Sequence, residues 1–341
     1  MTSVMGIFTA LGSLLAGALI VQKVRRYALR AGVLDVPDAR SSHEIPTPRG
    51  GGMGILIPVI IVLSALPLFG VGAALAYLPV AAVILIGFVG WLDDHLSLPV
   101  GPRLAAHVVA GVALAYLFVG EGATGLVWLP PGILAGFVWA FWTVSVVNVV
   151  NFLDGTDALI GVQALVFGAF SAFALRASPY SLVAWATIGA SLGFLAFNWP
   201  PARIFMGDVG SGAVGVIFVV LGGSIVLQTG WTIFHAFLPL MPIFIDEVLT
   251  LSRRLRDGEK PWQPHRSHVY QLLVRSGWSH GQVAVLYGLA ALTSAAIPPT
   301  FPHADSGFLF ASTSLFLFLM PAAIVLRRRA LFQIRKGQAS E

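Results

Sequence analysis

Long apolar runs follow one another along almost the whole chain, and they limit the fold more than any other feature. A membrane-crossing helix needs about 20 mainly apolar residues. About eleven such runs lie near residues 4–22, 51–70, 74–92, 104–120, 126–147, 158–175, 180–197, 211–228, 231–251, 281–300 and 307–326. Only 10% of the residues are charged, whereas a soluble domain carries about 25%. The sequence predicts an all-α, polytopic membrane protein, with residues 1–341 as one integral-membrane domain.

Basic residues gather in alternate connections between these runs, which predicts the orientation of the chain. With the N-terminus outside, the inside segments are 23–50, 93–103, 148–157, 198–210, 252–280 and the tail 327–341. They hold 19 of the 20 Lys and Arg residues, and only Arg176 lies outside. Because basic residues favour the cytoplasmic side, we expect a cytoplasmic C-terminus. The net charge of +5 then reflects orientation and contact with membrane lipid, and we expect no nucleic acid partner.

Aspartates collect in three short inside loops. Asp93 and Asp94 follow the third run, Asp154 and Asp157 stand between the fifth and sixth, and Asp208 precedes the eighth. One polar loop residue needs no function, but adjacent carboxylates repel each other unless a cation or a base role offsets the cost. Carboxylates in this number suit Mg²⁺, which binds through one or two of them plus substrate phosphates. The pattern predicts a metal and a phosphate substrate at one membrane face.

Glycines beside the last of these aspartates favour the same chemistry. Gly207, Gly210 and Gly212 surround Asp208 where the eighth run begins. An open helix N-terminus binds anions through free N–H groups and the helix dipole. Close helix packing is the alternative reason for glycine here.

The first inside loop combines cations with a stiff backbone. Arg40, His43 and Arg49 bracket the segment Pro46–Thr47–Pro48, and a run of glycines follows. Cations on a proline-stiffened loop beside an aspartate cluster can clamp a diphosphate. A loop that only sets membrane orientation would explain the charge but not the prolines and glycines.

The last large inside loop carries a second basic group, with His265, Arg266 and His268 close together and His280 further along. Phosphate contact is the favoured interpretation, and half of a zinc site is the alternative, although no third ligand stands nearby in the sequence. The absence of cysteine excludes thiolate ligands and nucleophiles.

Two carboxylates lie within the ninth run. Asp246 and Glu247 are placed about one turn from its inner end, and a carboxylate inside a membrane is a functional candidate by default. The structural alternative is an ion pair with Arg253 or Arg254.

Five motifs together resemble the polyprenyl-phosphate N-acetylhexosamine-1-phosphate transferase family. They read DVPDARSSHEIPTPRGGG, GWLDDHLSL, NVVNFLDGTDALIG, NWPPARIFMGDVGSG and PHRSHVYQ, in this order, over about residues 33 to 282. The forms of the first and last motifs look most similar to the branch that starts O-antigen. About eleven runs also agree with the polysaccharide-initiating branch.

The resemblance implies a reaction and a set of partners. Such an enzyme moves a sugar 1-phosphate from a UDP-N-acetyl sugar to undecaprenyl phosphate, releases UMP and starts O-antigen or another lipopolysaccharide-type surface polymer. It would work with Mg²⁺, or with Mn²⁺ as a substitute, on the cytoplasmic face of the bacterial inner membrane. Small-residue faces at Gly215 and Gly222–Gly223 permit helix packing within one chain or between two copies, so a homodimer stays open.

The resemblance also assigns roles to individual residues. The implied metal ligands are Asp93, Asp94, Asn151 and Asp208. The implied catalytic groups are Asp93, Asp94 and Asp154. The implied substrate-binding residues are Arg40, His43, Arg49, Asn148, Asn151, Asp157, His265, Arg266 and His268. If the central loop starts a helix, Asp154 and Asp157 share one face, and Ala158 stands where many relatives have glycine.

Two other classes of function stay open. A lipid flippase or another transporter would bind near the middle of the membrane and often shows inverted repeats, whereas here the carboxylates cluster at one face. A scaffold without catalysis would not need five loop aspartates. Attack by the lipid phosphate directly on the sugar-linked phosphorus is the predicted route, and an aspartyl-phosphate on Asp93 or Asp94 is the competing one.

Overall fold

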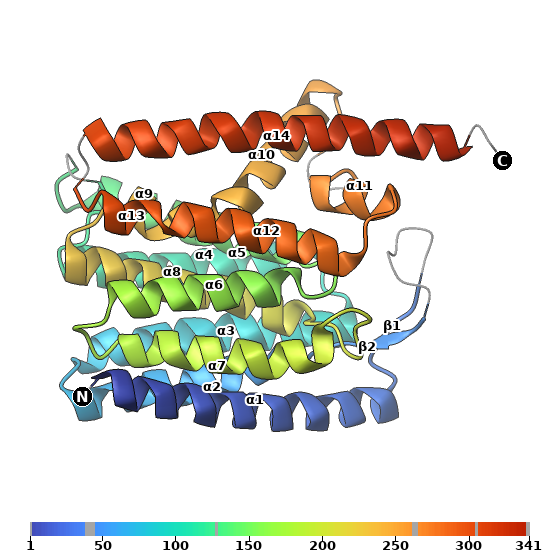
Figure 1. The fold of residues 1–341 in the computed structure, drawn as a ribbon. Coiled ribbons are helices and arrows are strands. Elements are labelled where there is room, and N and C mark those ends of the chain that lie inside the picture. Colours follow the sequence, from blue (N-terminus) through green and yellow to red (C-terminus); the bar gives the residue numbers. More distant parts are fainter. Residues whose placement is uncertain (1, 38–44, 127–128, 261–264, 304–305, 339–341) are drawn as a thin grey trace.

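The chain folds into a bundle of helices in the computed structural model, which describes residues 2–37, 45–126, 129–260, 265–303 and 306–338 (Figure 1). The longer helices are α1 (Thr2–Ala31), α2 (Met53–Ala65), α3 (Ala73–Leu96), α4 (Val100–Gly120), α5 (Ile133–Leu153), α6 (Leu159–Ala174), α7 (Ser181–Asn198), α8 (Asp208–Thr229), α10 (Met241–Arg256), α12 (His280–Ala295) and α14 (Ser306–Gln338). The shorter elements are β1 (Leu34–Asp35), β2 (Thr47–Pro48), η1 (Leu66–Phe69), α9 (Ile233–Phe237), η2 (Leu238–Leu240), α11 (Val269–Arg275) and α13 (Ile297–Thr300).

The helices match the predicted apolar runs. Over the described residues, nine helices or joined helix pairs are long and apolar enough to cross a membrane, and two shorter apolar helices lie at Met53–Phe69 and Leu159–Ala174. Each overlaps one of the predicted runs. The prediction of an all-α, polytopic membrane protein is therefore confirmed.

Several helix ends differ from the predicted boundaries. Helix α1 continues to Ala31 and α14 to Gln338, so the inside segments predicted as 23–50 and 327–341 begin within helices. Their Lys and Arg residues are good helix formers whose charged ends reach water from a helix surface. In contrast, α5 begins only at Ile133, later than the run predicted from residue 126.

Helix α8 forms the centre of the bundle. Its residues from Val209 to Val226 are buried, as expected for a helix that is apolar on every side. A Cβ at Gly215 would overlap Val147, and Cβ atoms at Gly222 and Gly223 would overlap aromatic rings of α9 and α4. These small-residue faces therefore serve packing within the chain.

Helices that alternate in direction bring distant loops to one end of the bundle. The end that holds β1, β2 and α11 also receives the C-terminal ends of α3 and α5 and the start of α8 (Figure 1). The two short strands pair antiparallel, with Leu34 opposite Pro48 and Asp35 opposite Thr47. This pairing carries the first inside loop back to the bundle.

The ninth predicted run is bent. Helices α9 and α10 are separated by the 3-10 turn η2, and Pro239 and Pro242 lie in or next to it. Proline lacks an N–H donor and interrupts the helical hydrogen-bond ladder. Helix α10 therefore leaves the bundle and runs towards α14, with α11 nearby (Figure 1).

Candidate active site

A polar cavity of about 620 Å³ opens at this loop-rich end of the bundle. It lies where the chain segments around β1, α3, α5, α8 and α11 meet. Its charged and amide side chains are Asp35, Arg49, Asp94, Asn151, Asp154, Asp157, Asn198, Asp208, Arg266, Gln271 and Arg275. Four of the five predicted loop aspartates thus line one cavity.

Asp94 holds the start of α8. One carboxylate oxygen accepts a hydrogen bond from the Asp208 N–H at 3.0 Å, and the other accepts from the Val209 N–H at 3.1 Å. A carboxylate at a helix N-terminus is stabilised by the helix dipole. Gly90 and Gly207 permit this approach, because a Cβ at Gly90 would overlap the Asp208 carbonyl and one at Gly207 would lie 2.7 Å from Asp94 Oδ2.

Asp208 is joined to the end of α5. Its Oδ1 accepts a hydrogen bond from Asn151 Nδ2 at 2.5 Å, and the same amide nitrogen lies 2.9 Å from Ser211 Oγ. A metal ligand role for Asn151 would need the amide oxygen on this side, which is a rotation of the same group. Asp94 and Asp208 are thus brought together by direct contacts at the first turn of α8.

Asp154 follows the last residue of α5. Burial raises the pKa of Asp154 well above its usual value, and the negative charges of Asp208, Asp94 and Asp157 raise it further. Its carboxylate accepts no hydrogen bond from the described residues. Four carboxylates near one another in the cavity wall favour a proton or a cation between them.

Asp157 is held more firmly. Its Oδ2 accepts from the Ala202 N–H at 3.0 Å, and its Oδ1 lies 3.2 Å from His280 Nδ1. The loop is not helical there, because α6 begins only at Leu159. Asp154 and Asp157 therefore share the cavity without sharing a helix face, which corrects the expected reason for their spacing.

Ala158 adopts a left-handed conformation, with a φ of 64°. An L-residue reaches this region at a steric cost that glycine avoids. The Asn198 side chain supports the turn, because its Oδ1 accepts the Ala158 N–H at 2.8 Å. The conformation explains why glycine suits this position, and it places Asn198 beside the cavity.

Asp93 points to a different partner from Asp94. It forms an ion pair with Arg103 Nη1 at 2.5 Å and accepts a hydrogen bond from the Leu98 N–H at 2.6 Å. It is not among the residues that line the cavity. Asp94 therefore lines the cavity, whereas Asp93 is held by Arg103 at the start of α4 and its charge also acts on Asp208.

Only some of the predicted substrate-binding residues line the cavity. Arg49 lines the cavity and forms an ion pair with Asp35 at 2.6 Å, and Arg266 lines it as well. Arg40 and His43 lie outside the described residues. Asn148 donates a hydrogen bond to the Val144 carbonyl at 2.7 Å and does not line the cavity.

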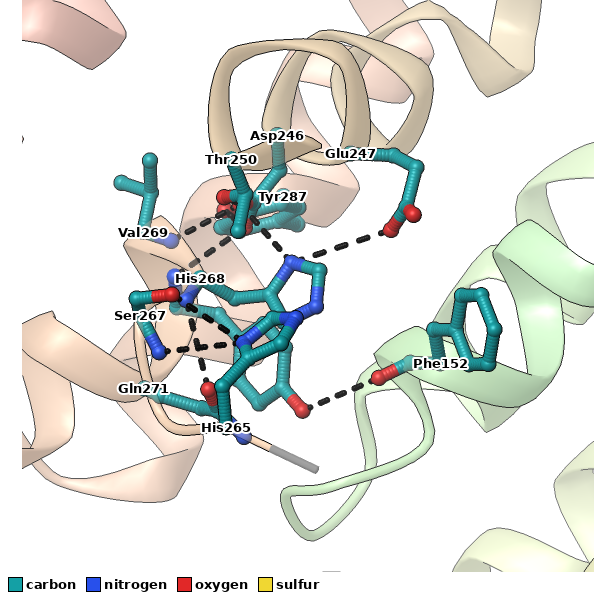
Figure 2. A network of polar contacts seen from close by, with 11 residues as sticks. Phe152, Asp246, Glu247, Thr250, His265, Ser267, His268, Val269, Gln271 and Tyr287 are labelled. Carbon is teal, nitrogen blue, oxygen red and sulfur yellow. Dashed lines mark hydrogen bonds and ion pairs between the residues drawn. The ribbon is translucent and has the colours of Figure 1, made fainter. Parts of the chain in front are cut away.

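The two histidines of the last loop lie in a buried network beside the cavity (Figure 2). His268 Nδ1 lies 3.4 Å from Asp246 Oδ1 and 3.8 Å from Glu247 Oε2. The His265 ring lies 4.8 Å from the His268 ring. Burial lowers the pKa of His265 to about 4, and the nearby charges of His268 and Arg254 act in the same direction.

The alternative for Asp246 and Glu247 is an ion pair with Arg253 or Arg254, and the ion pairs that these arginines form involve other carboxylates. Arg253 pairs with Asp257 and Arg254 pairs with Glu259. These arginines extend towards the following turn, whereas Asp246 and Glu247 point to the last inside loop. About two turns of helix separate the two groups.

The residues of the cavity fit a magnesium ion that shares its ligands with a substrate. No group of three or more His, Asp or Glu side chains among the described residues forms a complete metal site. However, Mg²⁺ often uses one or two carboxylates and takes its other ligands from phosphates and water. Asp94 and Asp208 supply such carboxylates, and Asn151 supplies an amide next to them.

Sequence reasoning missed several polar groups. Asn198, Gln271 and Arg275 line the cavity, and Arg103 holds Asp93. Gln271 ends the quoted PHRSHVYQ motif, which was a usable signal. Nothing in the sequence indicated Arg275, because its position depends on how α11 docks.

A second, smaller cavity adjoins the first. It has a volume of about 340 Å³ and shares Arg49 and Asp94 with the polar cavity. Its other walls come mostly from apolar and aromatic side chains of α1, α2 and α3, among them Tyr27, Met53 and Trp91. A polar cavity with an apolar neighbour suits an amphiphilic substrate.

The fold and the cavity define a multi-pass membrane protein with an aspartate-lined polar cavity at one end of its bundle. Residues 76–226 match the family described as glycosyl transferase family 4. A probable undecaprenyl-phosphate N-acetylglucosaminyl 1-phosphate transferase of Bacillus subtilis is 30% identical over 81% of this chain and 79% of that protein. The chain belongs to glycosyl transferase family 4.

Further relatives agree. An undecaprenyl-phosphate alpha-N-acetylglucosaminyl 1-phosphate transferase of Escherichia coli is 29% identical, over 80% of this chain and 77% of that protein. A decaprenyl-phosphate N-acetylglucosaminephosphotransferase of Mycolicibacterium smegmatis is also 29% identical, over 77% and 74%. The similarity to these relatives covers between 77% and 81% of the chain.

Proposed function

We propose that this protein transfers an N-acetylhexosamine 1-phosphate from a UDP-sugar to undecaprenyl phosphate. UMP would be released, and the undecaprenyl-diphosphate sugar would start O-antigen or another cell-surface polysaccharide. The observation that carries the proposal is the single cavity at which Asp94, Asp154 and Asp208 meet Arg266 and Arg275. The names of the relatives support polyprenyl-phosphate sugar-phosphate transfer as the reaction class.

The chemistry follows from the cavity wall. Phosphoryl transfer depends mainly on positioning and on stabilising charge. The arginines bind the phosphates of the donor, while the adjoining apolar cavity suits the isoprenoid end of the acceptor. Asp94 and Asp208, with Asn151, would hold Mg²⁺, which neutralises diphosphate oxygens when bound.

Direct transfer forms one bond to phosphorus and breaks another. An oxygen of the lipid phosphate attacks the sugar-linked phosphorus, and the bond between that phosphorus and the bridging oxygen breaks. UMP leaves with the bridging oxygen and its electron pair. Any proton on the attacking phosphate passes to the carboxylate of Asp154, which accepts no hydrogen bond from the described residues.

The contacts of the adjacent aspartates favour this direct route over an aspartyl-phosphate. Both oxygens of Asp94 already accept N–H groups of α8, and Asp93 is engaged by Arg103 and the Leu98 N–H. A carboxylate fixed by such donors is a weaker nucleophile. A phosphate adduct found on Asp93 or Asp94 by mass analysis after a single turnover would rule out direct attack.

The proposal is tested with purified protein in detergent, undecaprenyl phosphate, Mg²⁺ and a panel of UDP-N-acetyl sugars. The expected result is Mg²⁺-dependent release of UMP and a lipid product whose mass identifies the sugar. An Asp208→Asn variant of normal thermal stability serves as the negative control. Folded protein that binds undecaprenyl phosphate but releases no UMP from any donor would overturn the proposal and favour lipid transport.

A further inference from the structure

The buried carboxylate of Asp246 lies outside the cavity, and its contacts reach into the cavity wall. Asp246 is 1% exposed and belongs to α10. Burying a carboxylate is costly unless donors surround it. A buried carboxylate at this position therefore needs donors around it, and those donors show which parts of the chain it holds.

Its two oxygens receive donors from three helices and the loop between them. Oδ1 accepts from the Val269 N–H at 2.8 Å and lies 3.2 Å from Thr250 Oγ1. Oδ2 accepts from the Tyr270 N–H at 3.1 Å and from the Tyr287 hydroxyl at 2.5 Å. Figure 2 shows these contacts converging on Asp246, with His268 beside them.

Two of these donors are the first N–H groups of α11. A helix N-terminus leaves such groups without partners inside the helix, and here the carboxylate of another helix satisfies them. The side-chain charge also opposes the positive end of the short helix. Asp246 thus fixes where α11 begins and how far it stands from α10.

The Tyr270 side chain of α11 contacts the loop that carries Asp154. The Tyr270 hydroxyl donates to the Phe152 carbonyl at 3.2 Å, two residues before Asp154. A Cβ at Gly155 would overlap this tyrosine. Helix α11 is therefore held between Asp246 and the backbone that carries Asp154.

Gln271 and Arg275 lie four residues apart on α11, on the same helix face, and both line the cavity. Arg266, in the loop before α11, lines it as well. A shift of α11 would displace Gln271 and Arg275, which share the cavity with the aspartates. Misplacement by about 1 Å can reduce a rate about a hundredfold.

We propose that Asp246 is a positioning residue which sets the donor-binding wall of the cavity by holding the N-terminus of α11. This inference rests on the proposed function, because it assigns that wall to the UDP-sugar. Asp246 touches no substrate in this account. It acts through the placement of Gln271 and Arg275.

The test compares Asp246→Asn with Tyr287→Phe, and uses Ser294→Ala as the matched control. Asparagine keeps the size of the side chain but replaces one acceptor oxygen with a donor. Ser294 is buried on α12 like Tyr287, and among the described residues its hydroxyl bonds to the Ala290 carbonyl of its own helix alone. Tyr287→Phe keeps the carboxylate, so it tests the inference even if Asp246→Asn does not fold.

For Asp246→Asn we expect the KM for the UDP-sugar to rise about tenfold, as when one or two positioned hydrogen bonds are lost. The KM for undecaprenyl phosphate should stay unchanged, Tyr287→Phe should show a smaller change in the same direction, and Ser294→Ala should show none. A loss of active protein with unchanged KM values would mean a merely structural role and would overturn the inference.

Hydrogen exchange of residues 265–276 gives a readout that does not need turnover. UDP-N-acetylglucosamine and UDP are the probes, and we expect either to protect this segment in the wild type but not in Asp246→Asn. Protection without turnover in the wild type would count against the proposed transferase while supporting the positioning role. Equal protection in both proteins would overturn the positioning role alone.

Discussion

Two carboxylates at one end of the bundle, those of Asp246 and Asp154, have opposite surroundings. Asp246 receives two backbone N–H groups and two side-chain hydroxyls. In the cavity, Asp154 accepts no hydrogen bond from the described residues, and its neighbours are other aspartates, which raise its pKa. A carboxylate with full donors holds structure, whereas carboxylates that face one another are poised for a cation and a substrate.

The largest expected effect comes from the cavity side of this comparison. Asp208→Asn removes one negative charge from the first turn of α8. We expect turnover to fall by about 10²–10³-fold, as for the loss of one preorganised electrostatic group, while the melting temperature stays equal or rises because like charges are reduced. UMP release and thermal unfolding in detergent measure the two quantities. A large fall in both would assign Asp208 to the supporting group instead.

Replacing Arg103 tests the role of Asp93, which is neither a cavity-lining residue nor a contact of Asp246. Arg103→Gln would leave the 5% exposed Asp93 side chain without its cation, which costs about 1–3 kcal/mol when a buried partner loses its hydrogen bond. We expect lower thermal stability, partly restored by the double variant Asp93→Asn with Arg103→Gln. Unchanged stability with lost activity would move Asp93 into the cavity group.

His265, in the network beside Asp246, should make the thermal stability depend on pH. Its pKa is lowered to about 4 from an ordinary value of 6.5, so the unfolded chain takes up a proton at a pH where the folded chain does not. Its contribution to stability is therefore constant above pH 6.5 and is lost as the pH falls towards 4. The melting temperature of His265→Gln should fall less over this window than that of the wild type. Identical slopes for both proteins would contradict the buried, neutral state of His265.

Ala158 offers the smallest effect and tests strain beside the cavity. Ala158→Gly removes a left-handed alanine, a relief of about 1–2 kcal/mol, but adds backbone freedom to the unfolded chain at about 0.5–1 kcal/mol. We expect a net gain in stability of about 0.5–1 kcal/mol, measured by thermal unfolding. A loss of stability would show that the alanine methyl group packs better than its backbone conformation costs.

The sequence predicted the membrane class and most of the aspartates of the cavity, because both depend on local signals. Apolar runs mark helices wherever they pack, and charge bias along the runs brings Asp94, Asp154 and Asp208 to one face. It could not tell that Asp93 pairs with Arg103 of α4 while Asp94 accepts the first N–H groups of α8, since neighbouring residues on a helix point in different directions. The pairing of Asp246 with α11 was missed for the same reason, because its donors come from residues more than 20 positions away.

The most direct test of the central claim follows the phosphorus atom itself. UDP-N-acetylglucosamine, or the donor that the panel identifies, is labelled with ³²P at its sugar-linked phosphate and supplied with undecaprenyl phosphate and Mg²⁺. The account predicts that the label moves into the organic phase with the lipid and that the released UMP is unlabelled. Label that stays in the aqueous phase, in inorganic phosphate or sugar phosphate, would contradict transfer of a sugar 1-phosphate to the lipid.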